Sequence, residues 1–381
     1  MRYPIVATGP QVTRQVLADS PDLMTVAFRF AAAGATGALH HHPQVQSTFV
    51  LSGRFRFTVG EQTFDVGPND AFVIASNVPH GCLCLEPGTL IDGFTPRRSD
   101  FLRKERPMLR VETRQAISAT EAKSMDTAAL RANFHGEAMF QDGQIRLIYT
   151  HYDRMIVGGA VPAGGSLTLD HVRESGTASL LDRREMGIVN IGGTGTVTAG
   201  GNSHVMAKGD VLYLPMGAGA VTFSGLGRFY ITSCPAHHAH PARLIRLEDA
   251  KKLTLGAAET CNHRTINQFI HPDVMPSCQL VLGYTQFHGG SVWNTMPAHL
   301  HDRRMEAYLY FDIPEGQRVF HFMGQPSETR HLVIANEEAA LSPPWSIHCG
   351  AGTASYSFIW AMAGDNVDYR DVDAVRMEDL R

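Results

Sequence analysis

The chain has 381 residues, a formal net charge of −4 at pH 7 and a sequence pI of about 6.5. This near balance of charge, with RKER as the longest basic block, argues against a nucleic acid or a membrane surface as the main partner. No apolar run of about 18 residues occurs, and the first residues lack the apolar core of a signal peptide. We therefore expect a soluble, cytoplasmic protein that acts on a small molecule.

Composition also predicts the fold class. The chain contains 36 Gly and 20 Pro, and turn signals separate short runs rich in Val, Ile, Phe and Tyr about every ten residues. These features predict an all-β protein built from barrels, with few short helices. The strongest helical signal is at 118–134, where Ser118 and Glu121 have capping-box spacing and Asp126 can start a second short helix.

The first metal-binding pattern lies near the N-terminus. His40, His42 and Gln46 have equal parity in the sequence, so on a strand their side chains share one face. A hairpin bounded by glycine is expected at 52–53, and His80 follows a later turn. This order of residues predicts a divalent metal site, for Zn, Ni, Fe or Mn.

Residues 1–104 resemble the small cupin of pectin degradation that opens 4,5-unsaturated monouronates to 5-keto-4-deoxyuronate. The resemblance includes the closing stretch LIDGFTPRRSDFL, and it implies that Asp92 shuttles a proton, that Arg98 pairs with the uronate carboxylate and that Phe94 lines the substrate site. A solvated charge at the end of the domain is the alternative for Arg98. Gln46 replaces the glutamate usual in cupins, which leaves the metal and its ligands one charge unit more positive and favours an anionic substrate.

The charged, proline-containing segment RKERPMLR at 103–110 is the predicted domain boundary. We expect three cupin barrels of the double-stranded β-helix (jelly-roll) type. Their predicted ranges are 1–104, 105–250 and 251–381.

The second metal-binding pattern lies in PAHLHDRRME and PPWSIHCG. His299 and His301 share a strand face, whereas Glu306 has the opposite parity, so a bulge or tight turn within 302–305 must bring its carboxylate to the same side. His348 follows a Pro-Pro turn. Three imidazoles and one carboxylate suit zinc or a similar divalent ion with an open coordination position.

A family resemblance is carried by WNTMPAHLHDRRMEAYLYFDIPEGQRVFHFMGQPSETRHL and PPWSIHCGAGTASYSFIWAMAGDN. From about 111 to 381 the chain resembles the bacterial 5-keto-4-deoxyuronate isomerases, which are tandem-barrel cupins. The resemblance implies a homo-oligomer, a hexamer in that family, and Zn²⁺ bound by His299, His301, Glu306 and His348. Since Glu306 is used as a ligand, Tyr308, Tyr310 and a hydroxide on the metal are the candidates for the base that moves the proton.

Four further side chains are candidates to hold the carboxylate of a uronate. They are Arg303, Arg304, Arg330 and His331, of which the arginines offer bidentate geometry. Salt bridges at the rim are the alternative for each of them.

The middle segment contains a degenerate copy of the second pattern. SLLDRREMGIVNIGG echoes AHLHDRRMEAYLYFD around the shared DRR triplet. Aligned on that triplet, the ligand positions hold Ser179, Leu181 and Met186, which do not suit a metal. We predict that this barrel binds no metal.

The two resemblances together predict a bifunctional enzyme of unsaturated uronate catabolism, from pectin, alginate or glycosaminoglycan. The first unit would produce 5-keto-4-deoxyuronate, and the rest would isomerise this aldose to the ketose 3-deoxy-D-glycero-2,5-hexodiulosonate. Other interpretations are an isomerase with a regulatory or structural first unit, a metal-dependent cupin dioxygenase and a sugar-binding protein.

Overall fold

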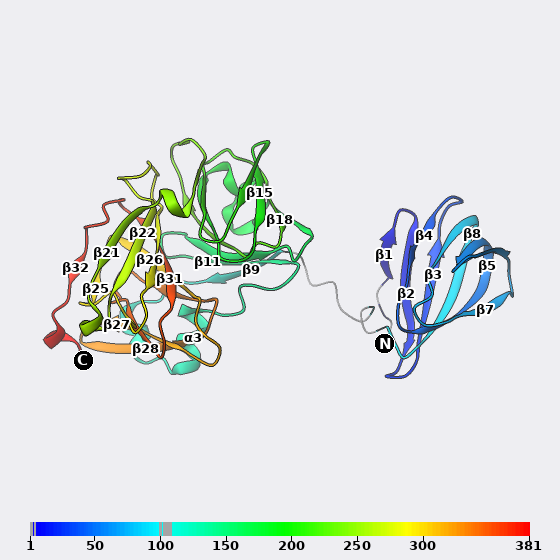
Figure 1. The fold of residues 1–381 in the computed structure, drawn as a ribbon, viewed down its shortest axis with the longest axis horizontal. Coiled ribbons are helices and arrows are strands. Elements are labelled where there is room, and N and C mark those ends of the chain that lie inside the picture. The colour runs from blue at the N-terminus through cyan, green and yellow to red at the C-terminus, as the bar shows by residue number, and fades with distance from the viewer. Residues whose placement is uncertain (1–2, 4, 99–100, 102–108) are drawn as a thin grey trace. The chain divides into compact units, whose positions relative to one another are not determined.

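The computed structural model describes residues 3, 5–98, 101 and 109–381. It divides the chain into two compact units, Met1–Arg106 and Pro107–Arg381, and strands are the main regular structure of both (Figure 1). The prediction of an all-β fold is confirmed. Of the predicted boundary at 103–110, residues 103–108 lie outside the described residues.

The N-terminal unit is a single eight-stranded antiparallel sheet. Its strands are β1 (Ile5–Gly9), β2 (Val12–Asp19), β3 (Met24–Phe30), β4 (Thr36–His40), β5 (Val45–Val59), β6 (Gln62–Val66), β7 (Ala71–Ile74) and β8 (His80–Thr95). The sheet order is β1-β2-β3-β8-β5-β6, with β4 also paired to β8 and β7 also paired to β5.

The hairpin expected at 52–53 is wrong, because β5 continues through these residues as one bent strand. The register between β5 and β8 shifts on both sides of Ser52, and Gly53 has a φ of 80°. A Cβ on Gly88 of β8 would lie 2.1 Å from the carbonyl oxygen of Ser52. Glycine therefore serves a bulge at which two long strands bend together, instead of a chain reversal.

The C-terminal unit contains two similar pairs of sheets, which we call the middle sheet pair and the last sheet pair. The middle sheet pair has a seven-stranded sheet of β9 (Leu109–Arg114), β11 (Gln144–Thr150), β12 (Ile156–Val161), β14 (Arg184–Asn190), β17 (Val211–Leu214), β19 (Phe229–Pro235) and β20 (Arg243–Ile245). Its four-stranded sheet consists of β13 (Ser166–Leu169), β15 (Gly195–Ala199), β16 (Asn202–Met206) and β18 (Val221–Gly225).

The last sheet pair repeats this arrangement. Its seven-stranded sheet is formed by β10 (His135–Gly136), β21 (Lys251–Leu255), β22 (Arg264–Ile270), β23 (Val281–Phe287), β26 (Arg304–Phe311), β29 (Glu338–Ser342) and β31 (Ser357–Gly364). The four-stranded sheet is formed by β24 (Trp293–Asn294), β27 (Val319–Gln325), β28 (Glu328–Ile334) and β30 (Cys349–Gly352). Two short strands, β25 (His299–Leu300) and β32 (Asp373–Ala374), pair separately.

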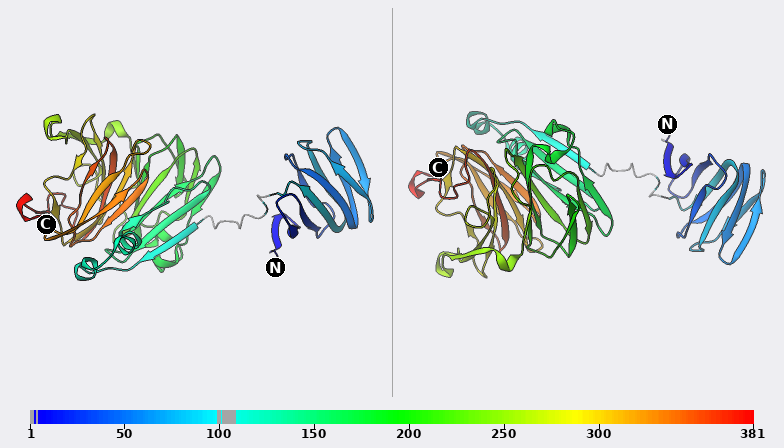
Figure 2. Two further views of the ribbon diagram at one scale, coloured as in Figure 1. Left: turned by 90° about the horizontal axis from the view of Figure 1, so that it is seen from below. Right: turned by 90° about the horizontal axis from the view of Figure 1, so that it is seen from above.

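The predicted helical stretch is confirmed as two helices, α2 (Ala119–Lys123) and α3 (Thr127–Phe134). Ser118 and Glu121 form the expected capping box, and the side chain of Asp126 caps α3. Helix α2 packs against β27, α3 packs against β28 and β29, and β10, directly after α3, pairs with β29. Figure 2 shows the two helices, in teal, on the outside of the C-terminal unit. This segment therefore belongs structurally to the last sheet pair, although we predicted it as part of the barrel at 105–250.

The two sheet pairs also share a hydrophobic core. One cluster of buried side chains includes Val157 and Tyr213 from the middle sheet pair and Leu309 and Trp360 from the last. Burial across this boundary explains why the two pairs form one compact unit.

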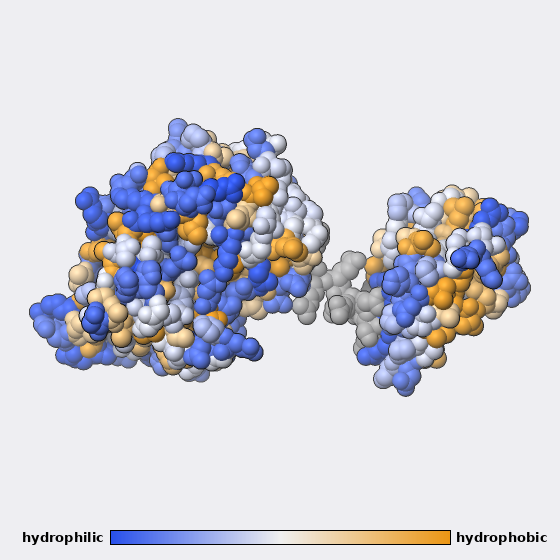
Figure 3. Space-filling model, in the orientation of Figure 1, coloured by the Kyte–Doolittle hydropathy of each residue, from blue (hydrophilic) through white to orange (hydrophobic). Residues whose placement is uncertain are grey.

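The surface of the N-terminal unit carries large exposed apolar side chains. Apolar residues gather on the face of this unit that Figure 3 shows, and Leu39, Leu51 and Val73 are each more than half exposed. Patches of this kind mark contact surfaces, but the oligomeric state stays a prediction.

Among the described residues, no helix is long and apolar enough to span a membrane.

Candidate metal centres

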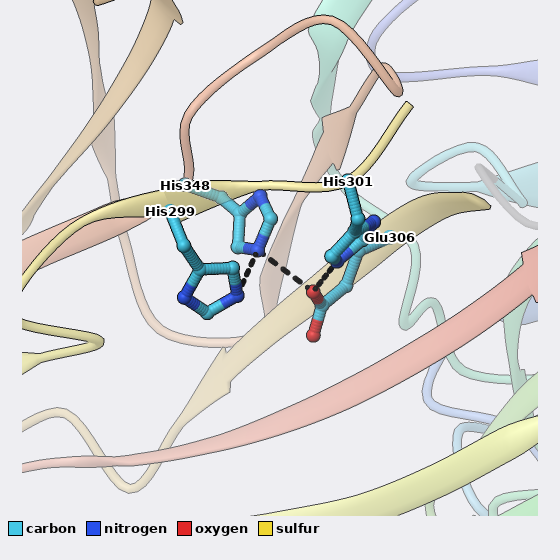
Figure 4. A group of neighbouring side chains, drawn as sticks. All are labelled: His299, His301, Glu306 and His348. Atoms are coloured by element: carbon cyan, nitrogen blue, oxygen red, sulfur yellow. Dashed lines mark hydrogen bonds and ion pairs between the residues drawn. The ribbon is translucent and has the colours of Figure 1, made fainter. Parts of the chain in front are cut away.

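The last sheet pair brings the four predicted ligands of the second pattern together (Figure 4). The Nε2 atom of His348 lies 3.0 Å from Nε2 of His299 and 3.0 Å from Oε2 of Glu306. Nε2 of His301 lies 3.1 Å from the same carboxylate oxygen. Two ligand atoms about 2.1 Å from one ion and at right angles lie about 3.0 Å apart, so the set fits a single divalent ion.

A tight turn directs the carboxylate into this cluster, as predicted. Residues 302–303 form the turn between β25 and β26, which the backbone N–H of Arg304 closes by donating to the carbonyl of His301 at 3.1 Å. The turn interrupts the strict alternation of side chains along the strand, so that Glu306 lies on the same side as the two histidines.

Neighbouring oxygens fix the orientation of two imidazoles. Nδ1 of His301 lies 2.8 Å from the carbonyl oxygen of Arg304, and Nδ1 of His348 lies 3.3 Å from Oγ of Ser342. A ring N–H that donates to a carbonyl leaves the lone pair on Nε2, which then faces the cluster.

Burial and mutual contacts shift the pKa values of the cluster. Burial alone would raise the pKa of Glu306, but the imidazoles of His348 and His301 outweigh it and hold that pKa well below its usual range. Burial, together with the neighbouring His348, lowers the pKa of His299 to about 3. At neutral pH the cluster therefore offers a carboxylate and a neutral imidazole, the forms that bind a metal.

A cavity of about 390 Å³ opens onto this cluster. His299, Glu306 and Tyr308 lie in its wall, together with residues that the sequence interpretation missed, namely Arg264, Thr295, Trp360, Tyr369 and Arg370. Tyr369 and Arg370 come from the C-terminal segment, which returns to the site as β32 pairs with β25. A single sequence carries no local signal for this long-range return.

The structure places the four candidates for carboxylate binding outside the residues of the cavity wall. Arg303 forms ion pairs with Asp371 and Asp373. Arg304 is fully buried, and its guanidinium donates to the backbone carbonyl of Asp371 at 2.6 Å. Arg330 donates to the carbonyls of Lys123 and Met125 next to α2, and His331 is exposed on β28. The arginines are engaged in contacts with other segments of the chain, and His331 contributes nothing to the cavity wall.

The N-terminal unit brings its own predicted ligands together. His40, His42 and His80 have ligand atoms within 4.8 Å of one another. Oε1 of Gln46 lies 3.1 Å from Nε2 of His42 and 3.2 Å from Nε2 of His80. Each histidine places Nδ1 within 3.0 Å of a backbone carbonyl, of Ala38, Gln44 and Val78 respectively.

Asp92, Phe94 and Arg98 line a small pocket of about 70 Å³ that includes His40, Gln46 and His80. Asp92 is buried, and burial raises its pKa to about 7 despite contacts with Thr48 and Gln46. The guanidinium carbon of Arg98 lies 5.6 Å from the centre of the Phe94 ring. The geometry thus places an ionisable carboxyl and a cation beside the ligand cluster.

The middle sheet pair has apolar side chains at two of its three degenerate ligand positions. Leu181 and Met186 lie fully buried in its own hydrophobic cluster. Ser179 precedes a short 3-10 helix, Leu180–Asp182, and shares a capping box with Asp182. That this region binds no metal stays a prediction.

Comparisons with known proteins agree with the two resemblances. The KduI/IolB family profile matches residues 134–379, and a Cupin domain profile matches residues 28–92. A 4-deoxy-L-threo-5-hexosulose-uronate ketol-isomerase of Cereibacter sphaeroides is 73% identical over 274 residues, which are 72% of this chain and 100% of that protein. The corresponding protein of Agrobacterium fabrum is 65% identical over 274 residues, also 72% of this chain and 100% of its own length.

Two solved structures match parts of this chain. An IolB-like protein of Salmonella typhimurium matches with a TM-score of 0.53 and 18% identity, over 64% of this chain and 97% of that one. KdgF from Halomonas sp. is 35% identical over 26% of this chain and 93% of its own, with a TM-score of 0.25. The chain belongs to the KduI/IolB family, and it carries an additional cupin domain at its N-terminus.

Proposed function

We propose that residues 107–381 isomerise 5-keto-4-deoxyuronate, which is 4-deoxy-L-threo-5-hexosulose uronate, from aldose to ketose. The observation that carries this proposal is the cluster of three imidazoles and one carboxylate at the end of a cavity. The ketol-isomerase of Cereibacter sphaeroides, matched along its whole length at 73% identity, supports it. The reaction is an intramolecular proton and electron rearrangement, so it needs no oxidant.

The four ligands suit a divalent ion, which would supply Lewis acidity to two adjacent substrate oxygens. The Nδ1 contacts keep the imidazoles of His301 and His348 aimed at the cluster. The hydroxyl of Tyr308 lies in the cavity wall, 3.3 Å from Oγ1 of Thr295. Burial raises the pKa of Tyr308, so at neutral pH this hydroxyl can donate a hydrogen bond to a substrate oxygen.

Tyr310 is the other tyrosine near the cluster in the sequence. Its hydroxyl is buried and lies 2.7 Å from Nδ1 of His321, and the residue lies outside the cavity wall. Of the two tyrosines, only Tyr308 therefore lines the cavity.

For the N-terminal unit we propose the preceding reaction, the opening of 4,5-unsaturated uronates. The C4=C5 enol ether takes a proton at C4 and the oxygen of a water at C5. The C5–O ring bond then breaks to leave the 5-ketone, and the hydrate left at C1 loses one water to give the aldehyde. The proposal is supported by a second ligand set, by the protonatable Asp92 and by the cation of Arg98. Asp92 would donate the proton, and Arg98 would pair with the substrate carboxylate.

One experiment separates the proposals. The full chain is incubated with 4,5-unsaturated galacturonate, and the products are followed by NMR against a control without protein. Formation of the ketose with accelerated loss of the double bond supports both activities. Loss of the double bond at the control rate, with conversion of supplied 5-keto-4-deoxyuronate, leaves an isomerase with a regulatory or structural first unit. Oxygen uptake would indicate a dioxygenase, and binding without turnover a sugar-binding protein.

A further inference from the structure

The corrected positions of Arg304 and Arg330 leave the carboxylate of the proposed substrate without an assigned partner. Both guanidiniums donate to backbone carbonyls elsewhere in the unit. A uronate that places C1 and C2 at the ligand cluster carries its carboxylate at C6, several carbons away from the cluster. The binding group therefore has to lie in the cavity wall, on another element.

Arg264, at the start of β22, has the properties that such a group needs. It is half-buried in the cavity wall, and its Nη1 donates to the carbonyl of Asn262 at 2.8 Å, which fixes the side chain. Burial lowers its pKa, because the cation loses solvent. Among the described residues, no carboxylate lies within ion-pair distance of it. A desolvated guanidinium without a counter-ion is a strong site for an anion.

Arg370 lies in the same cavity wall but comes from the C-terminal segment. Its nearest carboxylate is that of Asp368, at 3.6 Å, and its side chain is 90% exposed. The segment itself is held in place, because Arg303 forms ion pairs with Asp371 at 2.6 Å and with Asp373 at 2.7 Å. Arg370 is therefore a residue of the cavity wall whose side chain remains exposed.

The charge of the cavity agrees with an anionic substrate. A divalent ion bound by Glu306 and three neutral imidazoles would keep one positive charge, and Arg264 and Arg370 add two more. Resting on the isomerase function proposed above, we propose that Arg264 and Arg370 form the carboxylate subsite, with Arg264 as the main determinant of specificity for uronates over neutral sugars.

The test compares Arg264→Gln, Arg370→Gln and the matched control Arg330→Gln, each in the metal-loaded full chain. Two substrates are used, 5-keto-4-deoxyuronate and its neutral analogue with a hydroxymethyl group in place of the carboxylate. We expect Arg264→Gln to raise KM for the uronate about 100-fold and Arg370→Gln about tenfold, since charge-assisted bidentate pairs are strong and the second site is more exposed. For the neutral analogue, both variants should stay within about threefold of wild type.

Two further measurements separate a binding role from a structural one. Arg264→Lys should recover part of the loss, because it keeps the charge but not the bidentate geometry. Calorimetric binding of the uronate tests the subsite without requiring turnover. Equal losses with both substrates, or an Arg264→Gln variant that binds the uronate like wild type, would overturn the subsite assignment. A wild-type protein that binds the uronate but does not isomerise it would overturn the proposed function instead.

Discussion

The two ligand clusters of this chain have the same geometry but differ in charge. In each, one side-chain oxygen approaches the Nε2 atoms of two histidines, from Gln46 in the N-terminal unit and from Glu306 in the C-terminal unit, at 3.0–3.2 Å. The fold therefore determines the positions of the ligand atoms, whereas the choice of Gln or Glu at one position determines the net charge of the cluster. A metal in the N-terminal cluster would keep one more positive charge than a metal in the C-terminal cluster.

The pKa values of His42 and His301 shift in opposite directions, in agreement with this difference in charge. Burial lowers the pKa of His42 beside the neutral Gln46, even though their hydrogen bond opposes the shift. Burial also acts on His301, but its hydrogen bond to the Glu306 carboxylate outweighs it and raises the pKa. The carboxylate thus stabilises positive charge on its neighbours, whether the charge is a proton or a metal.

Loss of a histidine ligand should separate the two sites most strongly. His299→Ala should reduce isomerisation of 5-keto-4-deoxyuronate at least about 1,000-fold, because no other cavity group replaces the lost ligand. Loss of the 4,5 double bond should continue, so that the intermediate accumulates. NMR of both substrates measures the two activities on one preparation.

The double variant His40→Ala, His42→Ala is the reciprocal change, and it should slow double-bond loss to the rate without protein while sparing isomerisation. If this variant opens the unsaturated uronate as fast as wild type, the first unit is not an enzyme.

Removal of metal with a chelator should abolish isomerisation, and restored divalent ion should return it.

Exchange of the fourth ligand tests whether charge is the important difference. Glu306→Gln should weaken metal binding in the C-terminal cluster at least about 100-fold, because a neutral amide replaces a buried carboxylate. Gln46→Glu should strengthen metal binding in the N-terminal cluster. Metal titration of each variant gives the affinities, and unchanged values would show that geometry alone determines them.

Local features of this chain were predictable, because they depend on neighbouring residues. The shared face of His299 and His301 follows from the period of a strand, and the turn before Glu306 follows from its parity. The capping box of Ser118 and Glu121 likewise needs only a spacing of three residues.

Long-range features were not predictable in the same way. Arg370 lies in the cavity wall because the C-terminal segment returns to β25. Arg330 lies outside it, where its guanidinium donates to the carbonyls of Lys123, at the end of α2, and of Met125. The hairpin predicted at 52–53 was wrong, because a glycine with a positive φ such as Gly53 can occur in a bulge as well as in a turn. Tertiary contacts decided each of these cases.

The pH dependence should differ between the two sites. Burial raises the pKa of Asp92 to about 7, so the proton that it donates is present below that pH and is lost above it. Double-bond opening should fall about tenfold per pH unit above pH 7, whereas the ionised Glu306 gives isomerisation no such step. Because the raised pKa favours the neutral group in the folded state, its contribution to stability is lost as pH rises through about 7.

Rates of both activities between pH 6 and pH 9 on one preparation provide the measurement. Asp92→Asn should lack the opening activity at every pH. An opening rate that does not change across this range would rule out Asp92 as the proton donor.

The middle sheet pair offers a third comparison. Its glutamate, Glu185, directly follows the DRR triplet, one position earlier than Glu306 follows the same triplet in the last sheet pair. Glu185 is fully buried and accepts hydrogen bonds from the backbone N–H groups of 278–280 and from the hydroxyl of Tyr213. It therefore joins the two sheet pairs instead of facing a metal. Glu185→Gln should lower the free energy of unfolding by about 2–4 kcal/mol. Denaturant unfolding measures this loss, and bound metal per chain should not change.

The smallest expected effect concerns the C-terminal segment, which contributes Tyr369 and Arg370 to the wall of the C-terminal cavity. Arg303 holds this segment through Asp371 and Asp373, and both ion pairs are partly exposed to solvent. Exposed pairs contribute little each, so Arg303→Ala should raise KM for 5-keto-4-deoxyuronate only about threefold to tenfold. The kcat should change less, because His299 is also held by the pairing of β25 with β32. Steady-state kinetics with Arg376→Ala as the control, an arginine whose ion pairs lie within 376–379, checks the prediction. An equal effect of both substitutions would show that the Arg303 pairs do not position the cavity wall.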